Sequence, residues 1–470
     1  MKSNIKKILC LILAVAMIFA IVGCGKKSND PDFDDEDWAI DDNSGSGSGE
    51  GAEVDANVSE TKAEAGLSNA DSLSWSELVA KMPSNLKGKT VTMYSWNPAK
   101  HVTGAEKVIA NFEKQTGIKV DWKQGSYDNY DTEIAALINS GSSPDIIRYS
   151  SVNIYRMDLT QDVVSATGYD FKGDIWDKDV TSAYSVKGKI YGVNLKNTFN
   201  QQPTVVYYSG DTIKRYKLED PYDLWKAGQW TWNKFLDMCK DFKEQTGRPG
   251  WMTNYHLDLL DWSGLDFLTF DGNTFKDNSS NPQILTTLQK ICGYKDSITC
   301  EAMREQDKIE NGTYLFTTDN MLCARTTDFH YETLKGNNDL MTVPFPTGLT
   351  SSYVQPMHEY EAYGFPKGCK NGAAAYYFLR YYLNRDNYDA KTFFVNNQAL
   401  ETYDYAMKQK RFYKVSSGPM AVTAGSSNGG LDTYIRTQGK ADQIQSELDK
   451  IKPQFKRAAE QANAKIAKFK

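Results

Sequence analysis

The feature that most constrains the fold is a regular alternation of short β-rich runs and amphipathic helical segments, which begins at residue 90. Three runs read as strands: 90–95, 118–122 and 145–149. Between the first two, apolar residues recur at the spacing of one helix face, at Ala105, Val108, Ile109 and Phe112. Alternating strands and helices predict right-handed crossovers and a largely parallel sheet covered by helices, so the expected fold class is α/β.

The remainder of the chain continues in the same style. Later helices are expected over 231–246, 281–295, 371–384 and 386–410. Pro453 is expected to interrupt or begin a final helix that reaches Lys470, because proline lacks the N–H that a helix interior needs. No repeat of about 20–50 residues is present, which argues against a solenoid.

The N-terminus has the three regions of a secretory signal. Lys2, Lys6 and Lys7 form its positive end, and an unbroken apolar run follows over 8–22. This run is short for a bilayer crossing, which takes roughly twenty residues. Residues 21–24 (IVGC) resemble the lipobox of bacterial lipoproteins, with Ile21 where Leu is usual. The resemblance implies a signal peptide over 1–23 and a lipid on Cys24, and an uncleaved membrane anchor is the alternative.

The charge of the chain is concentrated behind this signal. Residues 24–70 hold thirteen acidic residues and three lysines, whereas 71–470 hold 48 basic and 47 acidic residues. With its Gly/Ser run at 44–49, the segment 24–70 is expected to be a disordered tether. The net charge of −6 argues against a general nucleic-acid binder, which carries a basic excess. Both N-terminal interpretations place the protein on the outer face of a bacterial cell membrane.

The chain carries few groups typical of metal or nucleophilic chemistry. It has four histidines and no HExxH, GxxxxGK[ST], GxSxG or CxxC pattern, so we expect no metal, no cofactor and no enzyme activity. The cysteines of the folded part are expected to be mostly free and buried, with a Cys292–Cys300 disulfide as the alternative. Glycosidases need only two carboxylates, so a surface glycan hydrolase or lyase stays open.

Seven short segments, in order, resemble the carbohydrate-type extracellular solute-binding proteins that serve ABC importers. They are 111–120 (NFEKQTGIKV), 143–147 (SPDII), 187–193 (KGKIYGV), 205–208 (VVYY), 231–235 (TWNKF), 343–346 (VPFP) and 366–371 (PKGCKN). Two stretches depart from the family pattern: a polar insertion at 196–203, and FTTDNM at 316–321 in place of Gly-Lys-Ala-Ala-Met.

The resemblance implies a two-lobe periplasmic-binding-protein-like fold, each lobe a largely parallel sheet flanked by helices, joined by a hinge. Lobe 1 would comprise 71–200 and 365–410, and lobe 2 would comprise 201–364 and 411–470. The chain would cross the hinge near 193–205, 363–367 and 410–416. A monomer would close on a sugar or oligosaccharide held between the lobes and deliver it to ABC permease subunits and their ATPase.

Ligands of such folds sit beyond the carboxyl ends of the strands, and sugars suit aromatic faces beside hydrogen-bonding groups. The candidates of lobe 1 are Trp96, Asn97, Tyr127, Asp128, Tyr149, Ser150 and Asn194. The candidates of lobe 2 are Asn254, Tyr255, Trp262, Arg325, Asp328 and Glu359.

Each candidate has a structural alternative. Asp128 could cap a helix, Arg325 and Asp328 could form a surface ion pair, and the tryptophans could be core residues. Asp145 is expected to hold a strand end, and Trp230 and Trp232 are expected to pack beside a helix cap at Thr231. A non-transporting glycan adhesin is a third reading. Glycan turnover would reveal the hydrolase, and intact uptake after gene removal would favour the adhesin over the importer.

Overall fold

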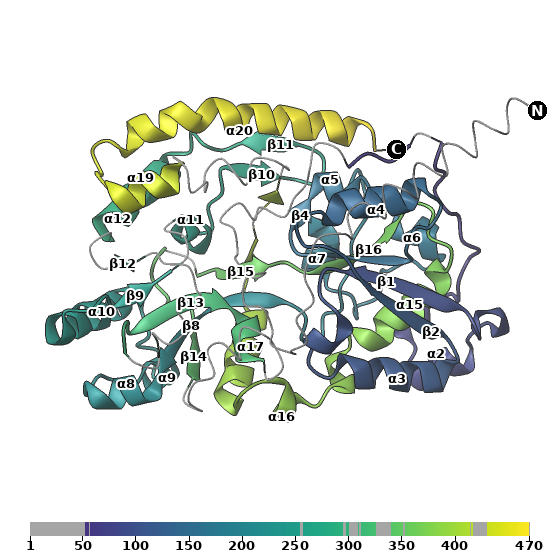
Figure 1. Ribbon diagram of the computed structural model, residues 1–470, viewed down its shortest axis with the longest axis horizontal. Coiled ribbons are helices and arrows are strands. Elements are labelled where there is room, and N and C mark those ends of the chain that lie inside the picture. Colours follow the sequence, from purple (N-terminus) through teal and green to yellow (C-terminus); the bar gives the residue numbers. More distant parts are fainter. Residues whose placement is uncertain are drawn as a thin grey trace, which may run out of the picture. The chain divides into compact units, whose positions relative to one another are not determined.

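The computed structural model describes residues 52–55, 57–253, 257–294, 298–299, 309, 312–325, 340–350, 353–413, 415–416 and 430–469. Among these residues, no helix combines the length and the apolar character that a membrane crossing requires. The described chain is built around two main sheets, each with its own helices (Figure 1).

The first sheet has the order β2-β1-β3-β16-β5. Its strands are β1 (Thr90–Ser95), β2 (Lys119–Gln124), β3 (Ile146–Tyr149), β5 (Thr160–Gln161) and β16 (Ala362–Pro366). β1 pairs in parallel with β2 and β3, as the strand–helix alternation predicts, whereas β16 runs antiparallel to β3. The carboxyl ends of β1, β2 and β3 therefore meet at one edge, which is where the sequence places its first candidates.

Helices cover this sheet and supply its core. They are α2 (Trp75–Ala80), α3 (Ala105–Thr116), α4 (Tyr130–Asn139), α5 (Ile154–Met157), α6 (Val163–Thr167), α7 (Lys178–Ala183) and α15 (Gly372–Tyr382). α3 ends at Gly117, whose φ of 73° is left-handed and therefore suits glycine. Its buried face, including Val108 and Phe112, packs against α15, so the predicted helical periodicity is confirmed.

The second sheet is mixed rather than largely parallel, and its centre is the long strand β8 (Gln202–Ser209). β13 (Phe316–Asn320), β14 (Leu340–Pro344) and β15 (Gln355–Glu359) all pair antiparallel with β8. The remaining strands pair in parallel: β9 (Trp251–Met252) with β13 and with β12 (Ile298–Thr299), and β17 (Arg411–Phe412) with β15. The strands beside β8 come later in the chain and run opposite to it. This part of the sheet is therefore not built from strand–helix–strand crossovers, which give parallel neighbours.

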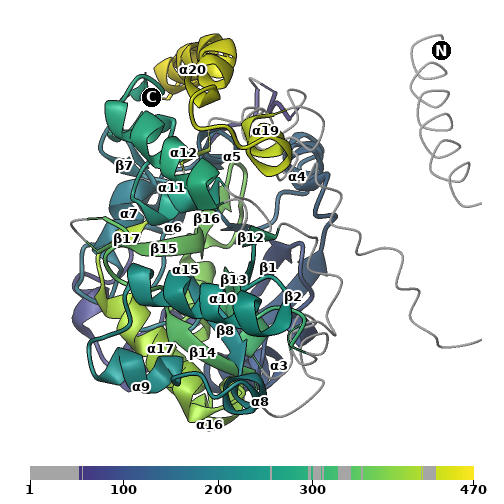
Figure 2. The ribbon, with the colours of Figure 1, turned by 90° about the vertical axis from the view of Figure 1, so that its left-hand side faces the viewer.

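The second sheet carries its own helices. They are α8 (Gly210–Arg215), α9 (Pro221–Lys226), α10 (Trp232–Thr246), α11 (Asp258–Trp262), α12 (Pro282–Tyr294), α16 (Ala390–Phe393), α17 (Asn397–Lys408) and α19 (Leu431–Thr437). Figure 2 shows α8, α9 and α17 beside the strands β8 and β14 that they contact. The helices predicted over 231–246 and 281–295 are confirmed as α10 and α12.

The single helix predicted over 386–410 is wrong. The chain forms a 3₁₀ turn at Arg385–Asn387, then α16, and α17 after a break. Asp389 and Asn396 each accept a hydrogen bond from a backbone N–H two or three residues ahead, so each starts a new helix. α17 packs on the second sheet, where Gln398 donates to the carbonyl of Thr342, so this stretch joins that sheet before the predicted crossing near 410.

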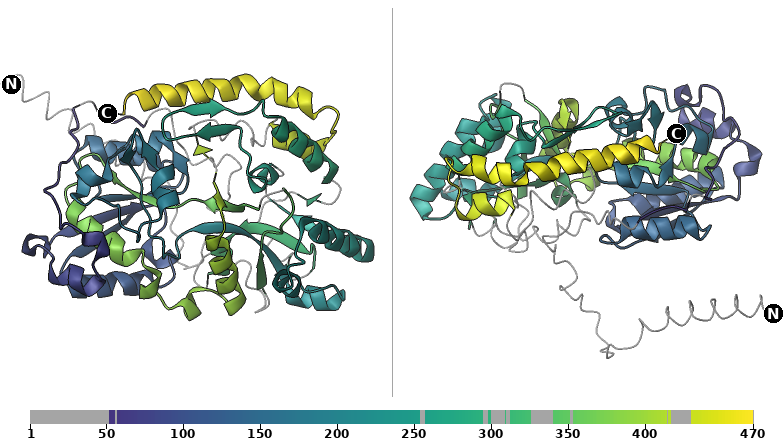
Figure 3. Two further views of the ribbon diagram at one scale, coloured as in Figure 1. Left: turned by 180° about the vertical axis from the view of Figure 1, so that it is seen from behind. Right: turned by 90° about the horizontal axis from the view of Figure 1, so that it is seen from above.

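Pro453 lies inside the final helix α20 (Ile444–Ala467), so the prediction that it interrupts or begins this helix is wrong. Tertiary packing maintains the helix, because its inner face is buried on both sides of the proline, at Leu448 and Phe455. The Phe455 ring stacks on Phe267 at 4.4 Å. Figure 3 shows α20 lying along the hairpin of β10 (Leu268–Phe270) and β11 (Phe275–Asp277).

Part of the expected tether is ordered against the first sheet's helices. Ala63 and Gly66 donate backbone hydrogen bonds to Ser165 and Gly168, and the Thr61 hydroxyl donates to the carbonyl of Cys369. Asp71 follows and accepts hydrogen bonds from Trp176 and Tyr376. The contacts begin earlier still, where the Asn139 side chain bonds to the backbone of Glu53 and Asp55, so the described part of this segment belongs to the packed structure.

Candidate functional site

Three of the candidates lie together beyond the carboxyl edge of the first sheet. Trp96 follows β1, Tyr127 follows β2, and Glu359 ends β15. The rings of Trp96 and Tyr127 meet edge to face, with centroids 5.9 Å apart. Tyr127 is 42% exposed, whereas Trp96 is mostly buried, so Tyr127 is the ring that a solute would meet first.

Arg148 connects the aromatic pair to Glu359. Its guanidinium carbon lies 4.5 Å from the centroid of the Trp96 ring, which is a cation–π contact. Its Nη2 donates to Glu359 Oε2 at 2.9 Å and to Glu361 Oε2 at 2.7 Å. Burial lowers the pKa of Arg148, but the two carboxylates outweigh that effect and raise it above its ordinary value. Arg148 therefore stays charged and holds the carboxylates in place.

Glu359 is also held from the second sheet, because Nε2 of Gln202, the first residue of β8, donates to the same Oε2. The side chain of Glu359 is 16% exposed, and that of Glu361 is 4% exposed. Burial raises the pKa of Glu361, an effect that the Arg148 guanidinium opposes.

A second ion pair, between Arg156 and Asp131, lies beside the rings of Trp96 and Tyr130. Arg156 Nε donates to Asp131, and both side chains are only 1% exposed. The Arg156 guanidinium lies 5.7 Å from the Trp96 centroid and 5.0 Å from the Tyr130 centroid. Both arginines are thus paired with carboxylates, and the three carboxylates Glu359, Glu361 and Asp131 outnumber the two guanidinium groups by one, so the site offers aromatic surface beside one excess acidic group.

The neighbouring candidates are placed around this cluster. Asn97 is partly exposed, and its carbonyl accepts a hydrogen bond from the Trp122 indole. Asp128 is exposed and does not cap α4, whose N-cap residue is Asn129. The carbonyl of Ser150 accepts a hydrogen bond from Tyr360. Asn97 and Asp128 therefore have solvent-accessible surface near the aromatic pair.

Other candidates lie inside the packed structure. Tyr149 is 0% exposed, and its hydroxyl contacts Thr160 Oγ1 and the carbonyl of Tyr191. Asn194 is also 0% exposed and donates to the carbonyl of Glu361, which joins two crossing segments. Arg325 is 4% exposed and donates to the carbonyl of Phe199. These contacts join segments that are distant in the sequence, so in this arrangement all three side chains stabilise the fold.

Trp262 ends α11 and is 4% exposed, with Trp251 at 5.5 Å on one side and Phe345 at 4.6 Å on the other. Trp230 and Trp232 pack as predicted, and Thr231 caps α10 by accepting from Lys234. Four predicted residues lie outside the described residues: Cys24, Asn254, Tyr255 and Asp328.

Asp145 confirms its structural interpretation. Its carboxylate accepts hydrogen bonds from the backbone N–H groups of Thr92, Lys370 and Asn371. It therefore joins β1, β3 and the start of α15, and it is only 3% exposed.

Sequence reasoning missed Arg148 and Gln202. The signal for Arg148 was present, since it is the one charged residue in the strand run 146–149 (IIRY), and a buried arginine needs partners. Gln202 had no such signal, because its role depends on a carboxylate more than 150 residues further along the chain.

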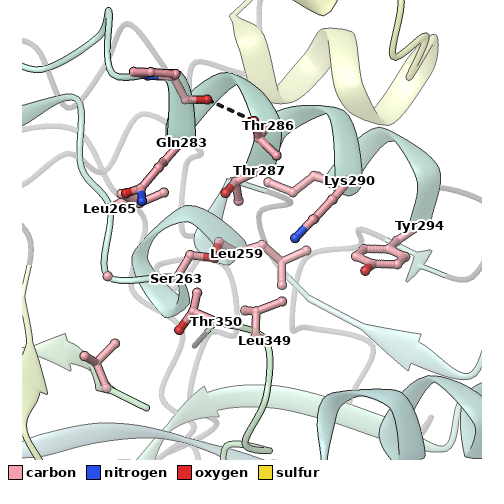
Figure 4. A pocket seen from close by; sticks show the side chains of 14 residues that line it. Leu259, Ser263, Leu265, Gln283, Thr286, Thr287, Lys290, Tyr294, Leu349 and Thr350 are labelled. Carbon is pink, nitrogen blue, oxygen red and sulfur yellow. Dashed lines mark hydrogen bonds between the residues drawn. The ribbon is translucent and has the colours of Figure 1, made fainter. Parts of the chain in front are cut away.

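A cavity of 430 Å³ lies in the second half, between α11, α12 and the loop before β15 (Figure 4). Its wall combines aliphatic side chains with hydroxyl groups and one lysine: Leu259, Ser263, Thr286, Thr287, Lys290 and Leu349. The volume falls within the range of small-molecule sites, about 300–1,000 Å³. Trp262, which ends α11, is not part of this wall. Because of its volume, the cavity is a second candidate site for a solute.

The part of the chain that the structure describes holds no group of three His, Cys, Asp or Glu side chains placed to bind a metal. Cys239, Cys292 and Cys369 are buried free thiols, as expected, and burial raises the pKa of each. Cys323 is buried as well, and Cys300 lies outside the described residues.

Comparisons with known proteins place the chain in a family. A profile of the bacterial extracellular solute-binding protein family matches residues 107–393, more than half of the chain. The chain therefore belongs to this family, which confirms the predicted resemblance. A search of curated proteins found no match.

Solved structures show the same fold at low sequence identity. The galacto-N-biose/lacto-N-biose I-binding protein of an ABC transporter from Bifidobacterium longum has a TM-score of 0.58 at 13% identity, covering 83% of this chain and 99% of its own. An extracellular solute-binding protein from Staphylococcus aureus, in complex with maltose, has a TM-score of 0.57 at 11% identity, covering 79% and 99%.

A third similar structure is the ABC substrate-binding protein Lmo0181 from Listeria monocytogenes, in complex with cycloalternan. Its TM-score is 0.52 at 16% identity, and the match covers 81% of this chain and 100% of that chain. These likenesses confirm the predicted two-lobe α/β fold.

Proposed function

We propose that this protein is a lipid-anchored receptor that captures a neutral sugar or oligosaccharide outside the cell membrane and delivers it to an ABC permease. The observation that carries the proposal is the cluster of Trp96, Tyr127, Arg148 and Glu359 at the carboxyl edge of the first sheet. A sugar ring can pack its C–H groups on an aromatic face while its hydroxyls bond to a fixed carboxylate.

The charge of the cluster supports a neutral solute. Arg148 is paired with both Glu359 and Glu361, and Arg156 is paired with Asp131, so the cluster has one carboxylate more than it has guanidinium groups. An acidic solute would bring further negative charge beside this excess carboxylate in a partly buried site, which costs free energy. The sugars named for the similar structures, lacto-N-biose, maltose and cycloalternan, are neutral as well.

Location and partners form the finer part of the proposal. The lipobox-like residues 21–24 support lipid anchoring at Cys24, and the acidic stretch behind them would serve as a tether. ATP hydrolysis would belong to the transporter's ATPase, since this chain has no phosphate-binding loop motif. We expect the receptor to act as a monomer with one solute.

The test is thermal unfolding of the purified protein with maltose, lacto-N-biose, galactose, a peptide mixture and digalacturonate. A solute that binds the folded protein raises the midpoint with increasing concentration, by about 2.7 kcal/mol of added stability at a hundredfold excess over Kd. We expect a neutral sugar to give the largest rise and to be recovered intact. Recovery of cleaved sugar would instead identify a hydrolase, and a rise with peptides alone would reject the sugar assignment.

A further inference from the structure

The carboxylate of Glu359 is held on one side only. Both of its hydrogen bonds, from Arg148 and from Gln202, reach Oε2. Oε1 makes no hydrogen bond to another described residue, and the side chain keeps 16% of its surface exposed. The two partners come from different sheets, β3 and β8, so the orientation of the carboxylate is set by the tertiary structure.

The two residues that hold Glu359 are themselves incompletely bonded. Arg148 Nε and Gln202 Oε1 are buried and have no hydrogen-bond partner among the described residues. Buried polar atoms without partners are uncommon, so the two side chains are held at Glu359 although each leaves a hydrogen bond unmade. Arg148 Nε is a donor and Gln202 Oε1 an acceptor, so neither side chain completes its hydrogen bonding through its contact with Glu359.

We propose that Glu359 is the specificity-determining residue of the solute site: its Oε1 accepts a hydrogen bond from a solute hydroxyl and repels a solute carboxylate, with Arg148 and Gln202 as positioning residues. This inference rests on the proposed function and adds the chemical discrimination that the site makes. Arg148 also fixes the Trp96 ring at 4.5 Å, so one side chain aligns both the aromatic surface and the acceptor. Neutral sugars present hydroxyl donors, whereas uronates present further acceptors.

The decisive variant is Glu359→Gln, which keeps the size of the side chain and removes its charge. Affinity for the better of maltose and lacto-N-biose should fall about ten- to hundredfold, as expected for the loss of a charged acceptor. Affinity for digalacturonate should rise, because the repulsion is gone and the new amide can donate. The ratio of the affinity for the neutral sugar to the affinity for digalacturonate therefore falls. A purely structural role of Glu359 would not change this ratio.

Arg148→Lys and Gln202→Met test the positioning roles by calorimetry with the same sugars. Each variant should bind the neutral sugar about tenfold more weakly than the native protein. Its thermal unfolding midpoint without sugar should stay within a few degrees of the native value. Arg385→Lys is the matched control, because Arg385 makes the same two kinds of contact elsewhere: an ion pair with Asp404 at 2.6 Å and a cation–π contact with Phe199 at 4.4 Å. The control should change affinity less than twofold.

The outcomes separate this inference from the proposed function. If neutral sugars bind the native protein and Glu359→Gln leaves the ratio unchanged, or weakens both sugars equally, the inference is overturned and the receptor stands. Preference of the native protein for digalacturonate also overturns it. If none of the sugars binds the native protein, the proposed function and the inference fall together. Should Arg148→Lys unfold, Glu359→Gln still decides.

Discussion

At the scale of single residues, burial separates the aromatic side chains that can meet a solute from those that hold the fold. Tyr127 has an exposed ring at the candidate site, whereas Tyr149, only one residue after Arg148, has none. Adjacent residues of a strand point to opposite faces of the sheet. In β3, Arg148 therefore contacts Trp96 and Glu359, whereas Tyr149 contacts Thr160 and Tyr191.

Tyr149→Ala should destabilise the protein rather than act on solute binding alone. The change removes a fully buried ring and its hydrogen bonds to Thr160 and Tyr191. We expect the free energy of unfolding to fall by about 3–5 kcal/mol. Chemical denaturation measures this value, and Tyr149→Phe is the control, with an expected loss of about 1 kcal/mol. An alanine variant of native stability would show that the ring does not support the core.

Tyr127→Ala should have the opposite profile. Its ring is 42% exposed and contacts Trp96 only by an edge, so the stability loss should stay near 1 kcal/mol. Sugar affinity, measured by calorimetry, should fall about tenfold because the stacking surface is lost. An unchanged affinity would move the solute away from this edge of the sheet.

At the scale of elements, short polar caps decide where helices begin and end. Asp389 and Asn396 divide the stretch 385–408 into three pieces, although its residues would otherwise favour one long helix. In α20, by contrast, packing overrides local preference: the helix continues through Pro453 because its inner face is buried on both sides of the proline. Local propensity decides where packing is weak, and packing decides where a long apolar face is available.

The cavity between α11 and α12 offers a test at this scale. Thr287→Trp places a large ring in its wall and should fill much of the 430 Å³. If the solute binds at the Trp96 site, sugar affinity should change less than twofold, because the altered helix carries none of that site's residues. A loss of more than tenfold, with an unchanged thermal midpoint, would instead assign the solute to the cavity.

At the scale of the whole molecule, the two sheets are tied together at more than the crossing strands. The C-terminal end of α20 reaches the first half, where Lys465 Nζ lies 2.8 Å from Asp158 and the Phe469 ring meets Tyr191 at 5.0 Å. Lys187 donates to the carbonyl of Phe469, close to the end of the described chain. The middle of the same helix stacks Phe455 on Phe267 in the second half.

Lys465→Met should therefore weaken the connection between the two halves. The Lys465 side chain is 10% exposed and Asp158 23% exposed, so removing the pair should lower the free energy of unfolding by about 1–3 kcal/mol. Lys450→Met on the same helix is the control, since its pair with Glu447 is exposed and should contribute less than about 0.5 kcal/mol. Equal effects of the two variants in thermal unfolding would show that α20 does not connect the halves.

The family, the strand–helix order of residues 90–149 and most of the later helices could be predicted from the amino-acid sequence. These depend on periodicity and caps within a few residues, and on short motifs that can be read in order. Trp96 and Tyr127 were predicted as candidates because residues that follow parallel strands gather at one edge of a sheet, and Glu359 because it precedes the expected hinge crossing near 363–367. The contacts of Arg148 and Gln202 with Glu359, and the burial of Tyr149 and Trp262, became visible in the folded chain and not before. The reason is physical: those contacts join residues more than 150 positions apart, or depend on which face of a strand or helix is covered, and no local pattern records either.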